Sequence, residues 1–131
     1  MTFDYSAYLE VKEYVEKNAI NSVKIIAISK NHSENSIKTA ISYGIKIFGE
    51  NKIQEAIGKF SSIKKQFPNI ELHLTGVLQT NKVKQAIGIF DVFQTLDREK
   101  LANTFHKHQN IIVNKQFFIQ VNIGKEDNKS G

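Results

Sequence analysis

One lysine of this sequence stands where α/β proteins place reactive groups, directly after a strongly apolar segment. Residues 23–28 are aliphatic apart from one lysine, and Ser29 and Lys30 follow them. Such a run of β-branched residues is typical of a buried parallel strand. Since side chains alternate along a strand, we expect Lys30 to share a face with Ile26 and Ile28. An ammonium at the carboxyl end of a buried strand suits binding or catalysis, although a lysine that simply begins a solvated loop gives the same pattern.

Polar residues also follow other predicted strands, but none of them is diagnostic alone. Glu50 and Asn51 come after a short apolar segment, where Glu50 suits the N-terminal dipole of a following helix. His73 lies in an alternating segment and is compatible with a hydrogen-bonded histidine inside the sheet. The loop at 75–82 and Asn122 complete the set. The four histidines lack the spacing of a metal site, and the sequence contains neither a glycine-rich phosphate loop nor a nucleophile elbow.

Hydrophobic periodicity predicts strands and helices in alternation along the chain. We expect Ser33 to cap one helix and Gly44 to end it, while Asp97 is expected to cap a later one. This alternation is typical of a parallel sheet with helical crossovers, either a complete open sheet or slightly more than half of an eight-stranded barrel. The predicted strands are 23–30, 45–48, 70–75, 90–94 and 116–123, with a leading helix at 4–17 and one helix between each pair of strands.

Composition limits the classes of protein that this chain can represent. Its 131 residues suit one domain, and 40% hydrophobic with 24% charged residues indicate a globular protein. No apolar run approaches the roughly 18 residues that span a bilayer, no secretory signal is visible and cysteine is absent, so we expect a cytoplasmic protein. The net charge of +5 suits an anionic ligand, but the lysines are scattered and Arg98 is the one arginine, which argues against nucleic-acid binding.

Five short motifs of the sequence carry a resemblance to a known family. They are Ile25–Lys30, Phe48–Glu55, Leu72–Lys82, Gln120–Ile123 and Asn128–Gly131. In this order they resemble the motifs of the pyridoxal-phosphate homeostasis proteins, single-domain relatives of the alanine racemase N-terminal barrel. The resemblance extends from about Val23 to the last residue. It implies a TIM-barrel type of (β/α) fold in which residues 1–131 form a partial barrel, truncated after about five of eight strands, with the C-terminal strands missing.

The resemblance also implies a cofactor and the residues that hold it. In this family the lysine that ends the first strand carries pyridoxal 5′-phosphate as a Schiff base, and here that position is Lys30. Asn51 and His73 correspond to positions in or near the ring pocket, while Lys82 and Lys129 match lysines that supply positive potential near the phosphate. The groups that anchor the phosphate would lie beyond the last residue, on loops after strands seven and eight. The resemblance implies no metal and no catalytic residue.

The chemistry of the lysine agrees with this assignment. An amine must lose its proton before it attacks an aldehyde, and partial desolvation by Ile26 and Ile28 favours the neutral form. Three positions depart from the family pattern. His32 stands where a second lysine is common, so an auxiliary amine is lost there. Leu72 replaces a common aromatic residue before the strand-three histidine, and Thr75 replaces a common isoleucine after it.

Three functions remain open at this stage. The first is a carrier that buffers pyridoxal phosphate without catalysis of its own, with the cofactor and apo enzymes that use it as partners and no membrane partner. The second is a pyridoxal-phosphate-dependent amino-acid racemase, which needs an acid–base group on the opposite ring face from a second domain or subunit. The third is an α/β domain that binds a phosphorylated ligand or nucleic acid noncovalently. The resemblance favours the first.

Overall fold

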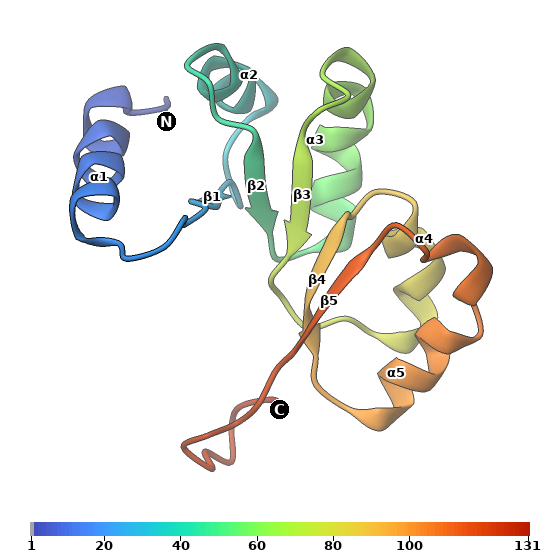
Figure 1. Ribbon diagram of the computed structural model, residues 1–131. Coiled ribbons are helices and arrows are strands. Elements are labelled where there is room, and N and C mark those ends of the chain that lie inside the picture. The colour runs from blue at the N-terminus through green and yellow to red at the C-terminus, as the bar shows by residue number, and fades with distance from the viewer. Residues whose placement is uncertain (1) are drawn as a thin grey trace.

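Five parallel strands form a single sheet in which the spatial order follows the chain order (Figure 1). The structure is a computed structural model, and it describes residues 2–131. It confirms the predicted mixed α/β class with a parallel sheet. The strands are β1 (Ala27–Ile28), β2 (Ile47–Glu50), β3 (Glu71–Leu74), β4 (Val92–Leu96) and β5 (Gln116–Ile119).

Helix α1 precedes the first strand, and the later helices connect the strands and pack against one face of the sheet. They are α1 (Tyr5–Asn18), α2 (Glu34–Ser42), α3 (Ile53–Gln66), α4 (Val83–Ile87) and α5 (Glu99–His106), with the short 3-10 helices η1 (Thr80–Lys82) and η2 (Gln109–Ile111). Phe48 of β2 contacts Phe60 of α3, and Phe93 of β4 meets Phe105 of α5 edge to face. In Figure 1 helix α1 lies beyond the β1 edge of the sheet, and Tyr5 of α1 stacks on Tyr43 at the end of α2 with 4.4 Å between the ring centroids.

The register of the strands decides which side chains share a face. One row across the sheet contains Ile28, Gly49, His73 and Val92, and the next row contains Glu50, Leu74, Phe93 and Phe117. Neighbouring rows point to opposite sides of a sheet. Because Phe93 contacts α5, the row with Glu50 points toward the helices, and we call that side the helix face. The row with His73 points the other way, toward what we call the inner face.

Local signals set most of the helix ends. The Asp4 side chain caps α1 by accepting the Ala7 N–H at 3.0 Å. Ser33 caps α2, and Gly44 follows that helix with a φ of 96°, so both predictions are confirmed. The prediction for Asp97 was wrong, because Arg98 is the N-cap residue of α5 and the Asp97 carboxylate accepts a hydrogen bond from the guanidinium of Arg98 at 2.7 Å.

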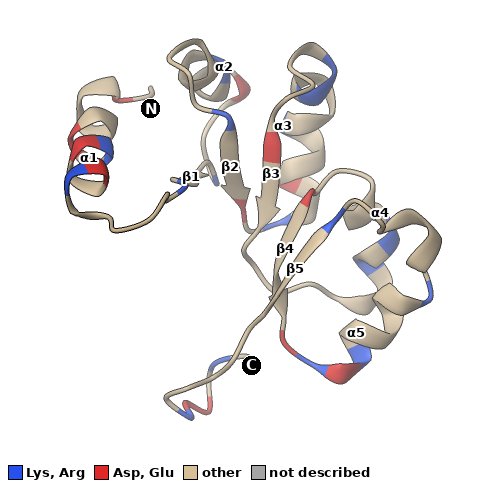
Figure 2. Ribbon diagram, viewed as in Figure 1, with Lys and Arg blue, Asp and Glu red and all other residues tan. Residues whose placement is uncertain are grey.

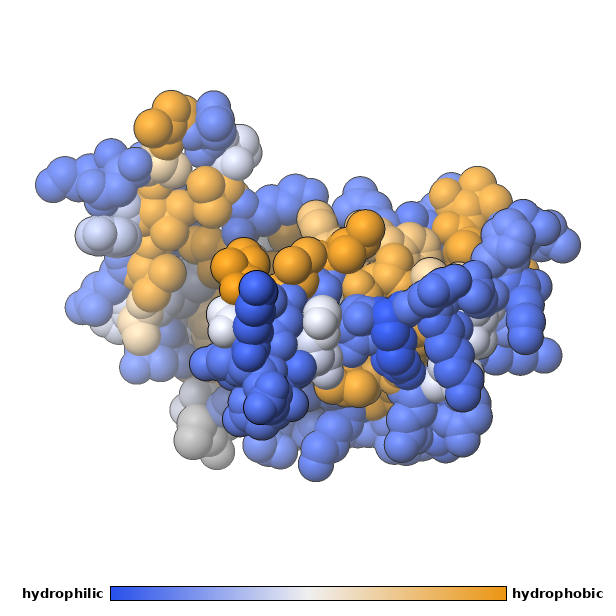
Figure 3. Space-filling view, turned by 90° about the horizontal axis from the view of Figure 1, so that it is seen from below, coloured by the Kyte–Doolittle hydropathy of each residue, from blue (hydrophilic) through white to orange (hydrophobic). Residues whose placement is uncertain are grey.

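The first strand is shorter and more exposed than its composition suggests. Only Ala27 and Ile28 pair with β2, and among residues 2–131 no strand lies on the other side of them. The expectation of a buried first strand was therefore wrong, and Ile28 is 48% exposed. At the opposite edge of the sheet, Phe118 and Ile119 of β5 are also exposed. Figure 3, which looks at the end of the sheet where the strands finish, shows hydrophobic residues uncovered among hydrophilic ones.

Charged groups are spread over the surface. Lys and Arg lie on several helices and loops with acidic residues between them, as Figure 2 shows. This distribution agrees with the scattered lysines of the sequence.

None of the helices that the structure describes is both long and apolar enough to cross a membrane.

Lys115, which precedes β5, leads to a prediction about stability and pH. Burial lowers the pKa of Lys115, the positive charge of Lys64 lowers it further, and Asp91 opposes the shift. The folded chain therefore holds this proton less tightly than the unfolded chain does. The free energy of unfolding should rise with pH between the lowered pKa and the ordinary value of 10.5, because the unfolded state binds more protons there.

Denaturant unfolding across that pH interval measures the effect. The contribution of this residue should vanish in Lys115→Gln, whereas Lys84→Gln, at an exposed position of α4, should keep it. Identical pH profiles for the Lys115 variant and the unaltered chain would contradict the prediction.

Candidate functional site

Lys30 lies in a tight turn at the carboxyl end of β1. The turn consists of residues 29–32, and the His32 N–H donates to the Ser29 carbonyl oxygen at 3.1 Å. Asn31, its third residue, has a φ of 64°. A positive φ at this position is what a type II turn requires, and asparagine tolerates it better than most residues. The turn therefore places Lys30 at a corner, directly after the strand.

The amine of Lys30 is accessible. Its side chain is exposed and makes no hydrogen bond or ion pair with any residue between 2 and 131. The expected desolvation by Ile26 and Ile28 is not present, since β1 is an uncovered edge strand and Ile28 itself is half-exposed. The structure thus presents a primary amine that is free to meet a ligand.

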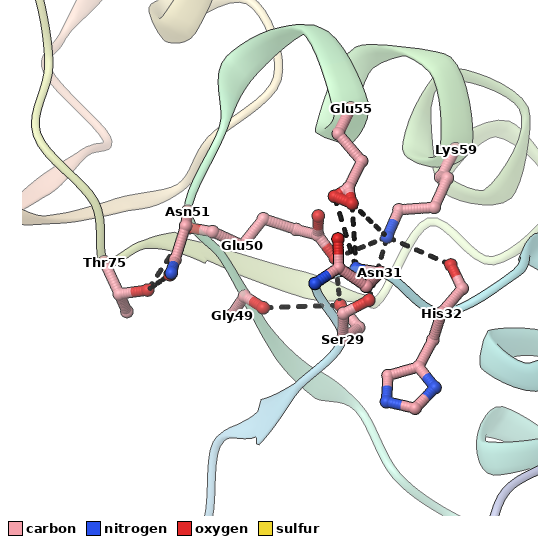
Figure 4. Close-up of polar contacts among 9 residues, drawn as sticks. All are labelled: Ser29, Asn31, His32, Gly49, Glu50, Asn51, Glu55, Lys59 and Thr75. Atoms are coloured by element: carbon pink, nitrogen blue, oxygen red, sulfur yellow. Dashed lines mark hydrogen bonds and ion pairs between the residues drawn. The ribbon is translucent and has the colours of Figure 1, made fainter. Parts of the chain in front are cut away.

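A buried carboxylate lies beside this turn, on the helix face. Glu50 ends β2, and its side chain is fully buried. Its Oε2 accepts hydrogen bonds from the Ser29 hydroxyl and, at 2.9 Å, from the ammonium of Lys59 in α3 (Figure 4). A buried carboxylate needs a cation or donors to offset its lost hydration, and Lys59 supplies the cation.

Asn51 follows β2 and is held by the end of β3. Its Oδ1 accepts a hydrogen bond from the Thr75 hydroxyl at 2.6 Å, and the same hydroxyl lies 3.2 Å from the Glu50 carbonyl oxygen. The backbone of Gly76 passes close to Asn51, so that a Cβ added to Gly76 would lie 2.2 Å from the Asn51 carbonyl oxygen. Only glycine fits at this crossing of the two loops.

On the inner face, the side chain of His73 lies between two polar partners, Glu71 and Gln94. Its Nδ1 is 2.8 Å from the amide nitrogen of Gln94, and its Nε2 is 3.2 Å from Glu71 Oε2. An ionised carboxylate only accepts hydrogen bonds, so the neutral ring carries its proton on Nε2 and accepts from Gln94 at Nδ1. The ring is mostly buried and fixed at both nitrogens, one residue before the end of β3.

The two remaining predicted lysines differ in their surroundings. Lys82 closes η1 and is partly buried. Lys129 belongs to the terminal loop, where it pairs with Glu126 at 3.0 Å and remains largely exposed. This loop folds back on Asn122, whose amide donates to the Glu126 carbonyl oxygen at 2.8 Å.

The structure therefore groups some of the predicted site residues through contacts made by their neighbours in the chain. Lys30 and Asn51 lie on adjacent loops, which the hydrogen bond from Ser29 to Glu50 joins. Asn51 in turn accepts a hydrogen bond from Thr75, two residues after His73. Within residues 2–131, Lys82 and Lys129 make no hydrogen bond or ion pair with this group. A hollow of about 520 Å³ lies among α1, β1 and α2, but Lys30, Asn51 and His73 do not line it.

Sequence reasoning missed two residues that contact the Lys30 turn. Glu55 accepts the Asn31 N–H at 2.8 Å, and Lys59 donates to carbonyl oxygens of the turn. Their i, i+4 spacing was visible in the sequence. However, the same spacing is common for ion pairs on solvated helix surfaces, so it did not single them out.

Curated proteins with similar sequences share one name. No protein-family model matches this chain. The pyridoxal phosphate homeostasis protein of Buchnera aphidicola subsp. Schizaphis graminum is 41% identical over 128 residues, which cover 93% of this chain and 54% of that protein. The protein of the same name from Haemophilus influenzae is 39% identical over 114 residues, or 85% of this chain and 47% of that protein. The chain spans about half the length of these relatives.

Solved structures with a similar fold include one protein, PipY, both without and with bound pyridoxal phosphate (PLP). PipY of Synechococcus elongatus PCC7942, solved without PLP, superposes with a TM-score of 0.81 at 32% identity over 93% of this chain and 57% of that one. The same protein with PLP bound gives a TM-score of 0.76 at 32% identity over 87% of this chain and 54% of that one.

The close approach of the Gly76 backbone to the Asn51 carbonyl oxygen predicts how a substitution at Gly76 affects stability and the position of Asn51. Gly76→Ala should lower the free energy of unfolding and move Asn51, because the new methyl group overlaps a backbone oxygen. Gly58→Ala is the control. An added Cβ meets nothing within 4 Å there, in the middle of α3, so this variant should be more stable by about 0.5–1 kcal/mol.

Denaturant unfolding of both variants, together with the NMR shifts of the Asn51 side-chain amide, checks this expectation. An Asn51 signal that stays unchanged in Gly76→Ala would show that the two loops are not held by this contact.

Proposed function

Because this chain is homologous to the pyridoxal phosphate homeostasis proteins over almost its whole length, we propose that it binds pyridoxal 5′-phosphate and takes part in controlling its supply. The observation that carries the proposal is the similarity to PipY, a relative whose structure has been solved with PLP bound. The free amine of Lys30 gives that similarity a chemical basis in this chain.

The residues present around Lys30 suit an aldehyde cofactor. With such a cofactor bound, the neutral amine would attack the aldehyde carbon and form a C=N bond, and the aldehyde oxygen would leave with the two amine protons as water. We propose that Lys30 forms this Schiff base. Its side chain has no competing ion pair among the described residues, and it projects from a turn whose backbone is hydrogen-bonded.

Neighbouring residues would hold the rest of the cofactor. Asn51 keeps its amide N–H groups for a ring substituent, because Thr75 occupies its Oδ1. His73 would pack beneath the ring from the inner face. Lys82 and Lys129 would contribute positive potential toward the phosphate, although Glu126 already offsets part of the charge of Lys129.

The relatives are named for homeostasis, and we propose a carrier rather than an enzyme. In this view the protein acts in the cytoplasm and passes the cofactor to apo enzymes that use it. Racemisation needs an acid–base group on each side of the ring, and Lys30 supplies one side only. Incubation with each alanine enantiomer and the cofactor tests this point, and conversion above the rate of free cofactor would contradict it.

We also propose that residues 1–131 are part of a (β/α) barrel. The order of the five strands never reverses, as it does in doubly wound open sheets. The helices that contact β2 and β4 lie on the same face, which suits a sheet curving around its inner face. The uncovered hydrophobic residues of β1 and β5 are where further strands would pair.

Substitution of the lysine tests the proposed Schiff base. Lys30→Ala should abolish the visible absorbance that develops when pyridoxal 5′-phosphate is added, because it removes the amine that forms the bond. Lys129→Ala is the matched control and should leave the absorbance largely intact. Borohydride reduction followed by peptide mass analysis then identifies the modified residue.

Absorbance that persists in Lys30→Ala would transfer the bond to another lysine. Absence of any such absorbance in the unaltered chain, with binding seen only by calorimetry, would favour a noncovalent phospholigand site instead.

A further inference from the structure

The backbone on both sides of Lys30 is held by one side chain from α3. The ammonium of Lys59 donates to the carbonyl oxygens of Ser29 at 2.8 Å and of His32 at 3.1 Å, the first and last residues of the Lys30 turn. Its third contact is the Glu50 carboxylate at 2.9 Å. A lysine ammonium has three N–H donors, and here all three are used.

Glu55 completes the hold on the turn. Its Oε1 accepts the Asn31 N–H at 2.8 Å and lies 3.8 Å from the Lys59 ammonium (Figure 4). Asn31 has the left-handed φ of 64°, a conformation that persists when surrounding contacts enforce it. Of the four turn residues, only Lys30 is without a contact to this group, which we call the Lys59 anchor (Glu50, Glu55 and Lys59).

The central ion pair of the anchor, Glu50 with Lys59, is shielded from water, so its attraction is only weakly screened. Glu50 is fully buried, and the Lys59 side chain is only 13% exposed. Ion pairs shielded from water hold their geometry better than exposed ones, which are screened and mobile. A turn fixed in this way keeps the start of the Lys30 side chain in one place while its amine stays free, so less ordering is needed when a ligand binds.

We propose that Lys59, supported by Glu50 and Glu55, is a positioning residue that fixes the Lys30 turn for reaction with an aldehyde ligand. The proposal rests on the proposed function of Lys30. Lys59 itself does not touch the ligand, since it lies on the helix face and its three donors are occupied by the turn and by Glu50.

The chain offers a matched control for Lys59. Lys64 is on the same helix and likewise joins a carboxylate to a backbone carbonyl, with Asp91 Oδ2 at 2.7 Å and the Ile89 oxygen at 2.7 Å. These contacts lie away from the Lys30 turn, at the start of β4. Lys59→Met and Lys64→Met therefore remove the same kind of interaction, but only the first removes it from the turn.

The experiment compares an aldehyde with the corresponding alcohol. Lys59→Met should weaken binding of pyridoxal 5′-phosphate roughly tenfold, since small misplacements of reacting groups are costly. Binding of pyridoxine 5′-phosphate, which cannot form the covalent bond, should not change, and Lys64→Met should alter neither. Lys59→Arg, which keeps the charge and the donors, should restore part of the aldehyde binding.

A second readout needs no ligand. Hydrogen exchange of the Asn31 amide should become faster in Glu55→Ala, because its acceptor is gone, and in Lys59→Met, while Lys64→Met should leave it unchanged. Glu55→Ala leaves no buried charge unpaired, so it keeps the proposal testable if Lys59→Met fails to fold. Glu55→Ala should also weaken aldehyde binding more than alcohol binding.

The outcomes separate this proposal from the assignment of Lys30. If covalent binding depends on Lys30 but is the same in Lys59→Met, Glu55→Ala and Lys64→Met, the positioning role is wrong. If both ligands weaken equally in Lys59→Met, its role is merely structural, which also overturns the proposal. If covalent binding survives Lys30→Ala, the proposed function at Lys30 fails, whatever the Asn31 amide shows.

Discussion

The parallel register of β1, β2 and β3 is the constraint on which the site depends. It places Ile28, Gly49 and His73 in one row on the inner face and turns Glu50 toward the helices. A slip of β2 by one residue would reverse both assignments, bringing the Glu50 carboxylate to the inner face and leaving Lys59 without its partner.

The buried pair of Glu50 and Lys59 makes this register costly to leave. Removing one partner of such a pair leaves an uncompensated buried charge, which typically costs about 3–5 kcal/mol. The pair joins the end of β2 to α3, and through Ser29 it reaches β1. Specificity for one register and support for the Lys30 turn therefore come from the same carboxylate. Its second oxygen, Oε1, has no hydrogen-bond partner among the described residues, so the ion pair carries most of the compensation.

Features that depend on the local pattern of residues, such as helices and their buried faces, could be predicted from the sequence. Features that depend on which elements pack beside a segment, such as the burial of a strand or a contact between elements, could not. The apolar spacing of α3 is local, and Ile53, Ala56, Phe60 and Ile63 are all buried as that spacing implies. The place of Lys30 after the first strand also followed from its neighbours in the chain. By contrast, burial of β1 depends on a strand at each side, which composition does not reveal. The contacts of Lys59 depend on how α3 crosses β1 and β2, and no spacing in the sequence encodes that crossing.

The exposure of Ile28 follows from the open β1 edge, and Lys30 emerges from the turn that follows this edge strand. Apolar surface left in water costs about 25 cal/mol per Å², so the half-exposed Ile28 and the exposed Phe118 and Ile119 favour any partner that covers them. In the proposed barrel, closure of the sheet would cover these residues and exclude water from the corner where Lys30 emerges. Covering the edge would thus stabilise the fold and enclose the corner from which Lys30 emerges by the same displacement of water.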